Sequence, residues 1–379
     1  MSVDRRKSLK VLFLTKYPYE IASTRYRVNQ FFPFLEENGI ECSFSPLMNI
    51  KFFRILHKQG QILYKILGVA WFSLRRFLDV FRALRYDVVF VQREALMVGP
   101  PVVEWLIAKV IRRPVVFDFD DALFLGSDGR ARERWIRMLK WPQKIVSILR
   151  LSSHVIVSTP YLQAYAAQYN PRVTVIPSVL DCQKFIPVRR DSREEITIGW
   201  VGTFSSWPYM ERLRDVFEEL GKRHRFVLKI VGLGRDYPLR SPNIEVINLD
   251  WDLEREVEDY QSLDIGVYPL IDDAWSRGKM GFKVIGYMAV GIPCVCSALG
   301  DHVRFLQDGV NGMLAATKEE WVEKLSRLIE DKELRRRIGE AARRTVEEWY
   351  CTARQAPRLR EILTGAKTHI AHHEFAQAD

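Results

Sequence analysis

Residues 277–315 read RGKMGFKVIGYMAVGIPCVCSALGDHVRFLQDGVNGMLA, and this stretch says more about the fold than any other part of the chain. The pattern predicts a basic, glycine-rich loop, a short helix, a Gly-Ile-Pro turn, a buried strand and a second short helix. Glycine lets a backbone approach a ligand closely, the N–H groups at a helix start converge, and cations offset negative charge. The stretch therefore predicts a phosphate-binding segment in an α/β protein.

The same stretch resembles the donor-binding segment of GT-B-fold glycosyltransferases, specifically the retaining family 4 (glycosyl transferases group 1). One branch of that family reads G-K-x-G-F-K-x-x-x-Y-M-A-x-G-x-P and then D-G-x-x-G. The matching residues here are Gly278, Lys279, Gly281, Phe282, Lys283, Tyr287, Met288, Ala289, Gly291, Pro293, Asp308, Gly309 and Gly312. The resemblance implies an α/β GT-B fold, in which two doubly wound parallel-sheet, Rossmann-like domains face a central cleft.

The match has a gap at two positions. Most family relatives carry two Glu eight positions apart in this segment, and the second usually binds the ribose of the donor. The aligned residues here are Gly278 and Gly286, which have no side chain to accept a hydroxyl hydrogen bond. Either another residue does this work, or donor binding is altered or lost. A glycine-rich packing unit without a ligand is the alternative interpretation of the segment.

Outward from this segment, apolar runs alternate with helical patterns in two blocks, which predicts two parallel sheets. The first block begins at residues 9–15 and the second at residues 196–201, and the periodicity is lost between Cys182 and Glu195. We therefore expect an acceptor-side domain over residues 1–190 and a nucleotide-sugar domain over 191–350. By resemblance, residues 351–379 form a helix that returns to the first domain, followed by a frayed tail.

Two further glycine turns follow predicted strands of the second domain. Gly202 and Thr203 come after ITIGWV, and Gly232 comes after FVLKIV. The alternative for Gly202 and Thr203 is an ordinary helix cap, and for Gly232 a turn. For the cations of residues 277–283 the alternative is a solvated basic loop. With the resemblance, the predicted donor-binding set is Gly202, Thr203, Gly232, Arg277, Lys279, Gly281, Phe282, Lys283 and Gly286. Lys283 is also predicted to be catalytic, because it would stabilise the charge of the leaving diphosphate.

The first domain offers charged residues at the predicted carboxyl ends of two strands. Arg25 and Arg27 lie in an element that resembles the branch's S-x-R-Y-R, and they are predicted to hold a phosphate of donor or acceptor. Asp118, Asp120 and Asp121 follow the run PVVF, and carboxylates so close together are costly unless they are exposed, paired or used. We expect Asp118 to bind the acceptor and Asp120 and Asp121 to orient it in catalysis. Helix capping is the alternative role, and neither a metal nor a cofactor is predicted.

The charge distribution points to a polyanionic partner. Residues 1–190 hold 30 Lys and Arg against 15 Asp and Glu, while the whole chain has a net charge of +10. No nucleic-acid-binding motif is present, so an anionic membrane is the favoured partner. Residues 51–85 carry eight Lys and Arg among apolar residues against one acid, Asp79. This insertion predicts helices lying on a membrane, although helices packed on the first domain would fit equally well.

The sequence thus predicts a glycosyltransferase that moves a sugar from a nucleotide-sugar to a lipid-linked or glycan acceptor, with retention. We expect it to work in cell-envelope polysaccharide synthesis, in the cytoplasm and peripherally on the inner face of the membrane. Five Cys without zinc-site spacing predict thiols in a reducing compartment. The alternatives are a non-catalytic, transferase-like membrane scaffold and a sugar-nucleotide epimerase of the same fold.

Overall fold

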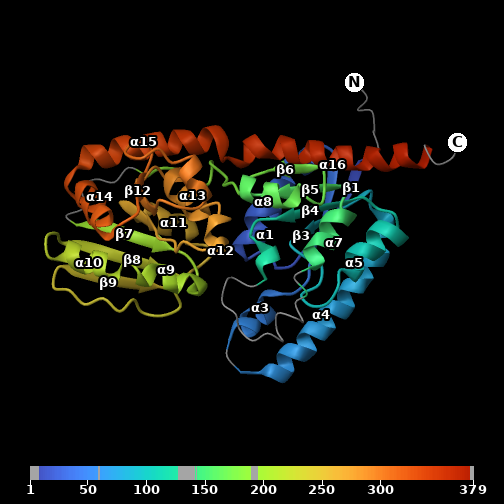
Figure 1. Ribbon diagram of the computed structural model, residues 1–379, viewed down its shortest axis with the longest axis horizontal. Coiled ribbons are helices and arrows are strands. Elements are labelled where there is room, and N and C mark those ends of the chain that lie inside the picture. The colour runs from blue at the N-terminus through green and yellow to red at the C-terminus, as the bar shows by residue number, and fades with distance from the viewer. Residues whose placement is uncertain (1–7, 59, 127–140, 142, 189–194, 376–379) are drawn as a thin grey trace. The chain divides into compact units, whose positions relative to one another are not determined.

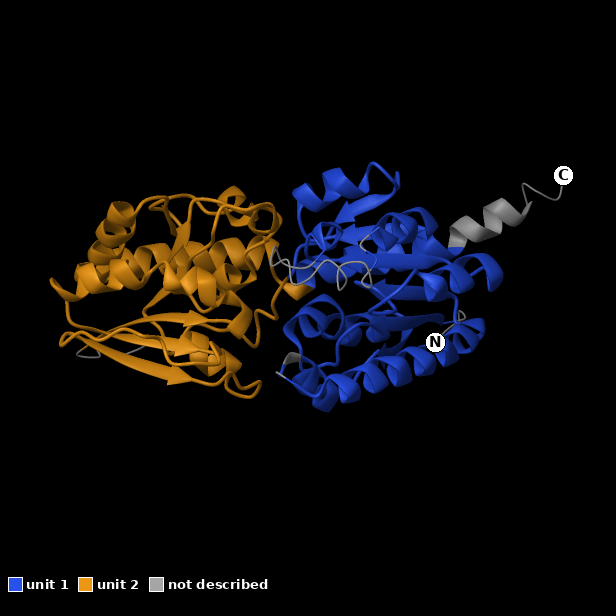
Figure 2. Cartoon of the chain, turned by 60° about the horizontal axis from the view of Figure 1, so that its bottom comes forward, with its two compact units in different colours: residues 1–178, 353–379 blue, residues 179–352 orange. Residues whose placement is uncertain are grey.

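The computed structural model describes residues 8–58, 60–126, 141, 143–188 and 195–375. The chain divides into two compact units, residues 1–178 with 353–379 and residues 179–352 (Figure 2). Each unit contains one six-stranded sheet, and helices connect the strands (Figure 1). The predicted α/β class with two parallel sheets is confirmed. Residues 189–194 of the predicted linker and the last residues of the predicted tail, 376–379, lie outside the described residues.

The first unit is built on a parallel sheet with the strand order β2-β1-β3-β4-β5-β6. Its central strands are apolar runs that are buried on both faces, as parallel sheets require. The strands are β1 Leu9–Thr15, β2 Ile40–Pro46, β3 Val88–Gln92, β4 Val115–Phe119, β5 His154–Val157 and β6 Val173–Val175. Asp118 therefore lies inside β4, whereas the sequence placed it after the strand.

The helices of the first unit are mostly short. They are α1 Ala22–Arg27, α2 Phe32–Glu37, α3 Ile50–His57, α4 Ile62–Arg82, α5 Val102–Trp105, α7 Lys144–Leu151, α8 Pro160–Ala166 and α16 Thr352–Phe375. Single turns occur at η1 Asn29–Phe31, η2 Ala83–Arg85, η3 Leu106–Val110 and η4 Leu123–Leu125. Helices α1 and α2 are separate, because the chain leaves helical geometry at Val28 and restarts with Pro33 in the first turn of α2.

The second unit repeats the architecture, with the strand order β12-β11-β10-β7-β8-β9. Its strands are β7 Ile196–Val201, β8 Phe226–Val231, β9 Ile244–Leu249, β10 Ile265–Tyr268, β11 Cys294–Ser297 and β12 Met313–Ala315. Its helices and turns are η5 Phe204–Ser206, α9 Trp207–Glu211, α10 Arg214–Gly221, α11 Glu256–Gln261, α12 Ala274–Arg277, α13 Phe282–Ala289, η6 Asp301–Arg304, α14 Lys318–Glu330 and α15 Lys332–Trp349. Side chains from α10, α14 and α15 bury one face of β7 and β8 in the main core.

The chain segments at the two ends of the second unit are joined to one another. The Leu180 N–H donates to the Tyr350 carbonyl at 3.0 Å, and Cys182 and Cys351 form a disulfide across a sequence separation of 169. The prediction that all five cysteines are thiols is wrong for these two. No sequence pattern indicated the disulfide, because its two cysteines meet only in the folded chain. Cys294 and Cys296 are free and buried in β11, as expected.

Candidate functional site

The loops after β7 and β8 meet at the carboxyl edge of the second sheet. Gly232 has φ 79°, and a Cβ there would lie 2.3 Å from the carbonyl oxygen of Gly202. A Cβ on Gly202 would lie 2.2 Å from the Trp200 ring and 2.7 Å from Cε of Lys283. Only glycine fits at both positions without rearrangement. The structure thus brings together three predicted donor residues: Gly202, Gly232 and Lys283.

Lys283 lies in the first turn of α13, at the same edge. The helix begins after Gly281, whose φ of 82° is the left-handed geometry that favours glycine. Lys283 Nζ lies 5.3 Å from the centroid of the Trp200 ring and 5.7 Å from that of Tyr268, within reach of cation–π attraction. Its charge adds to the positive end of the helix dipole. The first turn of α13 therefore favours an anion.

Lys279 supplies a second cation in the loop between α12 and α13. Its Nζ lies 4.5 Å from the centroid of the Tyr209 ring and donates to the Tyr209 hydroxyl at 3.4 Å. Ser276 Oγ donates to the same hydroxyl at 3.3 Å. Because Tyr209 belongs to α9, these contacts connect the basic loop to the segment that follows β7. Lys279 and Lys283 are both partly exposed, so both are accessible to a ligand.

Below this loop lies His302, a residue that the sequence analysis missed. A Cβ on Gly281 would lie 2.8 Å from the Cβ of His302, so the loop rests directly on this side chain. His302 Nε2 donates to the Ser297 carbonyl at 2.8 Å, and burial lowers the pKa of the ring to about 4. The neighbouring Asp301 is half-buried, and burial raises its pKa to about 6. The loop is therefore supported by a neutral histidine, not by a buried ion pair.

Several predicted donor residues do not join this group. Gly286 is buried against α11, where a Cβ would lie 2.5 Å from the Tyr260 ring, so it lies outside the group formed by the two lysines and the glycine turns. Arg277 is exposed and pairs with Asp272, with Nε and Oδ1 2.9 Å apart. Thr203 is exposed beside Ser205, and Phe282 is half-buried at the start of α13. The geometry is consequently strongest for the two lysines and the two glycine turns.

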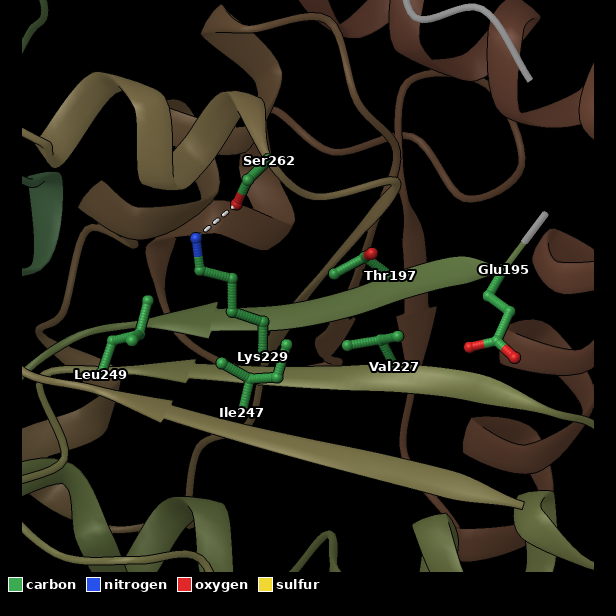
Figure 3. Close-up of a pocket in the computed structure, with 7 residues that line it drawn as sticks. All are labelled: Glu195, Thr197, Val227, Lys229, Ile247, Leu249 and Ser262. Carbon is green, nitrogen blue, oxygen red and sulfur yellow. Dashed lines mark hydrogen bonds between the residues drawn. The ribbon is translucent and has the colours of Figure 1, made fainter. Parts of the chain in front are cut away.

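A separate hollow of about 570 Å³ opens along the second face of β7, β8 and β9 (Figure 3). Its lining residues are Glu195, Thr197, Val227, Lys229, Ile247, Leu249 and Ser262. Lys229 Nζ donates to Ser262 Oγ at 2.7 Å and to the Asp259 carboxylate at 2.8 Å, so its charge is already compensated. None of the predicted donor residues lines this hollow.

In the first unit, the predicted phosphate and acceptor residues pair with one another. Both terminal nitrogens and Nε of Arg27 are used: Nε donates to Asp118 Oδ2 at 3.2 Å, one terminal nitrogen donates to Asp118 Oδ1, and the other donates to the Ile176 carbonyl. Both side chains are almost fully buried. The expectation that Arg27 and Asp118 meet a substrate does not fit this geometry. Arg25 is also buried; it donates to the Glu20 carbonyl at 2.9 Å and lies over the Tyr26 ring.

Asp120 and Asp121 remain at the carboxyl edge of the first sheet, where both bind Arg93. Arg93 Nε donates to Asp120 Oδ1 at 2.9 Å, and a terminal nitrogen contacts Asp121. Arg93 follows β3 and has φ 67°, which is rare for a residue with a side chain. Burial raises the pKa of Asp120, the Arg93 charge opposes that shift, and the charge of Asp121 adds to it. The sequence pattern does not single out Arg93, whose one distinguishing feature there is its place directly after a buried strand.

A second buried network lies beside this pair. Glu94 accepts from Lys16 and, at 2.6 Å, from Lys144, and these contacts lower the pKa of Glu94 against the effect of burial. Nothing in the sequence pattern singled out these residues. Over the described parts of the chain, no group of three or more His, Cys, Asp and Glu is arranged to hold a metal ion.

Comparisons with known proteins agree with this architecture. Residues 195–331, which hold Lys279 and Lys283, match the family described as "Glycosyl transferases group 1". A Rickettsia africae glycosyltransferase is similar over 95% of this chain and 99% of its own, with 14% identity and a TM-score of 0.66. The fold is that of GT-B glycosyltransferases.

Two further solved structures support that conclusion. Sucrose-phosphate synthase from Thermosynechococcus elongatus is similar over 97% of this chain and 100% of its own, with 14% identity and a TM-score of 0.66. Anabaena Alr3699/HepE, in complex with UDP and glucose, is similar over 94% of this chain and 99% of its own, with 15% identity and a TM-score of 0.63. Among curated proteins, none matches the chain.

Proposed function

We propose that this GT-B chain is a glycosyltransferase whose nucleotide-sugar donor binds at the carboxyl edge of the second sheet. The observation that carries the proposal is that Lys283 lies against the glycine turns of Gly202 and Gly232, while Lys279 adds a second cation in the loop that leads into α13. This combination of cations, close backbone approach and a helix start suits a diphosphate. The Anabaena neighbour, solved with UDP and glucose, supports a donor of this chemical class.

The proposed chemistry is sugar transfer with retention of configuration. The bond between the sugar and the diphosphate breaks, and negative charge grows on the leaving oxygen. Lys283 and the N-terminus of α13 would stabilise that charge, while Lys279 would help to hold the diphosphate in place. The leaving diphosphate itself would help to deprotonate the acceptor on the same face, so a strong protein base is not needed.

The acceptor, a lipid-linked sugar or a glycan, is proposed to bind the first unit near Asp120 and Asp121. These carboxylates are partly exposed, with side-chain exposures of 15% and 26%, and Arg93 holds both in fixed positions. A carboxylate held in this way orients an acceptor hydroxyl well. We therefore give these carboxylates the role of orienting the hydroxyl and not that of a general base. The proposed site of action is the cytoplasmic face of an anionic membrane, as the basic α3–α4 segment suggests.

A membrane scaffold without transferase activity is the second candidate. Tyr260 fills the space beside Gly286, where most family-4 relatives carry the Glu that binds ribose. A chain without that contact would bind a nucleotide-sugar weakly or not at all. Nucleotide binding therefore distinguishes the two candidates: a transferase binds a nucleotide-sugar, whereas a scaffold binds it weakly or not at all.

Calorimetric titration of the full chain with a panel of nucleoside diphosphates tests the proposal, followed by a turnover assay on the nucleotide-sugar whose diphosphate binds. A transferase binds at least one diphosphate and consumes the sugar-nucleotide when membrane lipid extract is added. Chelation of divalent metal should leave this turnover unchanged. Absence of binding across the panel would contradict the donor site and favour the scaffold.

A further inference from the structure

Helix α4 lies along the outer edge of the first unit (Figure 1). Its inner face is buried through Phe72, Arg76, Asp79 and Val80. Phe72 packs against Phe52 of α3, with ring centroids 4.9 Å apart. Within the described residues, neither α4 nor any other helix is long and apolar enough to cross a membrane.

A buried ion pair fixes which face of α4 points inward. Arg76 donates to the Thr15 carbonyl at 2.8 Å, to the Ser45 carbonyl at 2.9 Å and to Asp79 Oδ2 at 2.9 Å. Asp79 also accepts from Arg82 at 2.7 Å. Arg76 is one of the eight cations of residues 51–85 on which the predicted membrane contact rests, but it is buried and does not face outward. Arg76 instead attaches α4 to the carboxyl ends of β1 and β2.

The opposite face of α4 presents a continuous row of apolar side chains. The row consists of Leu63, Leu67, Trp71, Leu74, Leu78 and Phe81, each between 60% and 70% exposed. Spacings of three and four residues place these side chains on one side of a helix. At 1.5 Å per residue the row is about 27 Å long. An exposed apolar row of this length indicates an interaction surface.

The charges around this row identify its partner. Six cations of the same α3–α4 segment are exposed: Arg75, Arg82 and Arg85 in or just after α4, and Lys51, Arg54 and Lys58 in or just after α3. The only acid of residues 51–85, Asp79, is buried and already paired with Arg76 and Arg82. Two copies of this surface would bring like charges together, which disfavours self-association. An anionic lipid surface complements both the cations and the apolar row.

We infer that α4 lies flat in the interface of an anionic membrane, with the apolar row inserted and the six cations at the phosphate level. This inference rests on the membrane partner proposed above and assigns the contact to one face of one helix. The buried Arg76–Asp79 pair is the positioning element, because it turns the row outward. A lipid-linked acceptor would then reach a first unit that is already held at the membrane.

Vesicle flotation of the full chain tests this inference, with phosphatidylcholine vesicles and vesicles that also contain phosphatidylglycerol. Trp71→Ser with Leu74→Ser should reduce binding to anionic vesicles at least tenfold. The matched control is Trp105→Ser with Val110→Ser, which removes two exposed apolar side chains of the same unit outside the row and should leave binding unchanged. All four side chains are largely exposed, so folding should survive, and thermal melting checks this.

The contribution of the cations to membrane binding is tested by combining Arg75→Gln, Arg82→Gln and Arg85→Gln in one variant. At about fivefold per cation, anionic-vesicle binding should fall about a hundredfold. The control changes the exposed Lys222, Arg223 and Arg225 of the second unit to Gln and should have little effect. Equal flotation on both vesicle types, or a row variant that loses only self-association, would overturn the inference. Diphosphate affinity should stay constant in all four variants, so failure here is distinguishable from failure of the proposed function.

Discussion

The carboxyl edges of both sheets carry cations, but the contacts of those cations differ. In the first unit, Arg27 and Arg93 pair with the carboxylates that follow or end β4. In the second unit, Lys279 and Lys283 lie over aromatic rings beside glycine turns. Ion pairs neutralise the charges of the first edge from within, whereas an aromatic ring attracts a cation without cancelling its charge. The comparison indicates that the first edge is built for fixed geometry and the second for binding phosphate.

The largest expected effect comes from breaking the buried pair of the first edge. Arg27→Ala leaves the Asp118 carboxylate buried without its partner, and it should lower the free energy of unfolding by about 3–5 kcal/mol. Urea denaturation measures this. Arg277→Ala is the matched control, because it removes an arginine from a fully exposed pair with Asp272 and should leave stability nearly unchanged. Similar losses in both variants would contradict a structural role specific to Arg27.

The next effect concerns the departure from the family pattern at Gly286. Gly286→Glu forces a side chain into the Tyr260 ring, so overpacking alone should destabilise the chain by about 1–3 kcal/mol, before the cost of a buried carboxylate. Thermal or urea denaturation checks this. Gly365→Glu is the control, since no atom lies within 4 Å of a Cβ at that helical position. A stable Gly286→Glu variant with tighter diphosphate binding would show that the site extends to α13's buried side.

The smallest effect is the pH dependence of stability that His302 causes beneath the basic loop of the second unit. The His302 pKa is about 4 in the folded chain and about 6.5 when unfolded, so the unfolded chain binds the extra proton between those values. Stability should therefore fall as pH drops from 7 to 5, by about 2 kcal/mol from this group.

His302→Gln should remove that part of the loss, which urea denaturation at pH 7 and pH 5 would show. Asp301 acts in the opposite direction, since its raised pKa of about 6 favours the folded chain as pH falls from 6. Asp301→Asn should therefore steepen the loss at acid pH. Identical pH dependence in the His302→Gln variant and the native chain would contradict a buried neutral histidine.

Local patterns predicted much of the fold and part of the site. Apolar runs predicted both ends of the strands Leu9–Thr15 and Ile196–Val201 correctly, because buried parallel strands are nearly continuous apolar runs. The spacing of glycines and cations identified the loop of Lys279 and Lys283. These features depend on neighbours in the sequence, so the sequence alone was sufficient.

The features that were missed depend on contacts between distant residues. Arg27 and Asp118 are 91 positions apart, and Cys182 and Cys351 are 169 apart. No local pattern distinguishes a cation that will meet a carboxylate inside the fold from one that will meet a ligand. The same limit explains why Arg76 was assigned to the membrane surface.

The account's central claim is that the second edge binds a diphosphate through Lys279 and Lys283. The most direct test is calorimetric titration of the best-bound nucleoside diphosphate into the native chain and the variants Lys279→Ala and Lys283→Ala. The control is Lys222→Ala, which removes the same charge from an exposed site of the same unit. Each site variant should lose about 1.5–3 kcal/mol of binding free energy, the scale of hydrogen bonds to charged groups, while the control keeps native affinity. Native affinity in both folded site variants would contradict the claim.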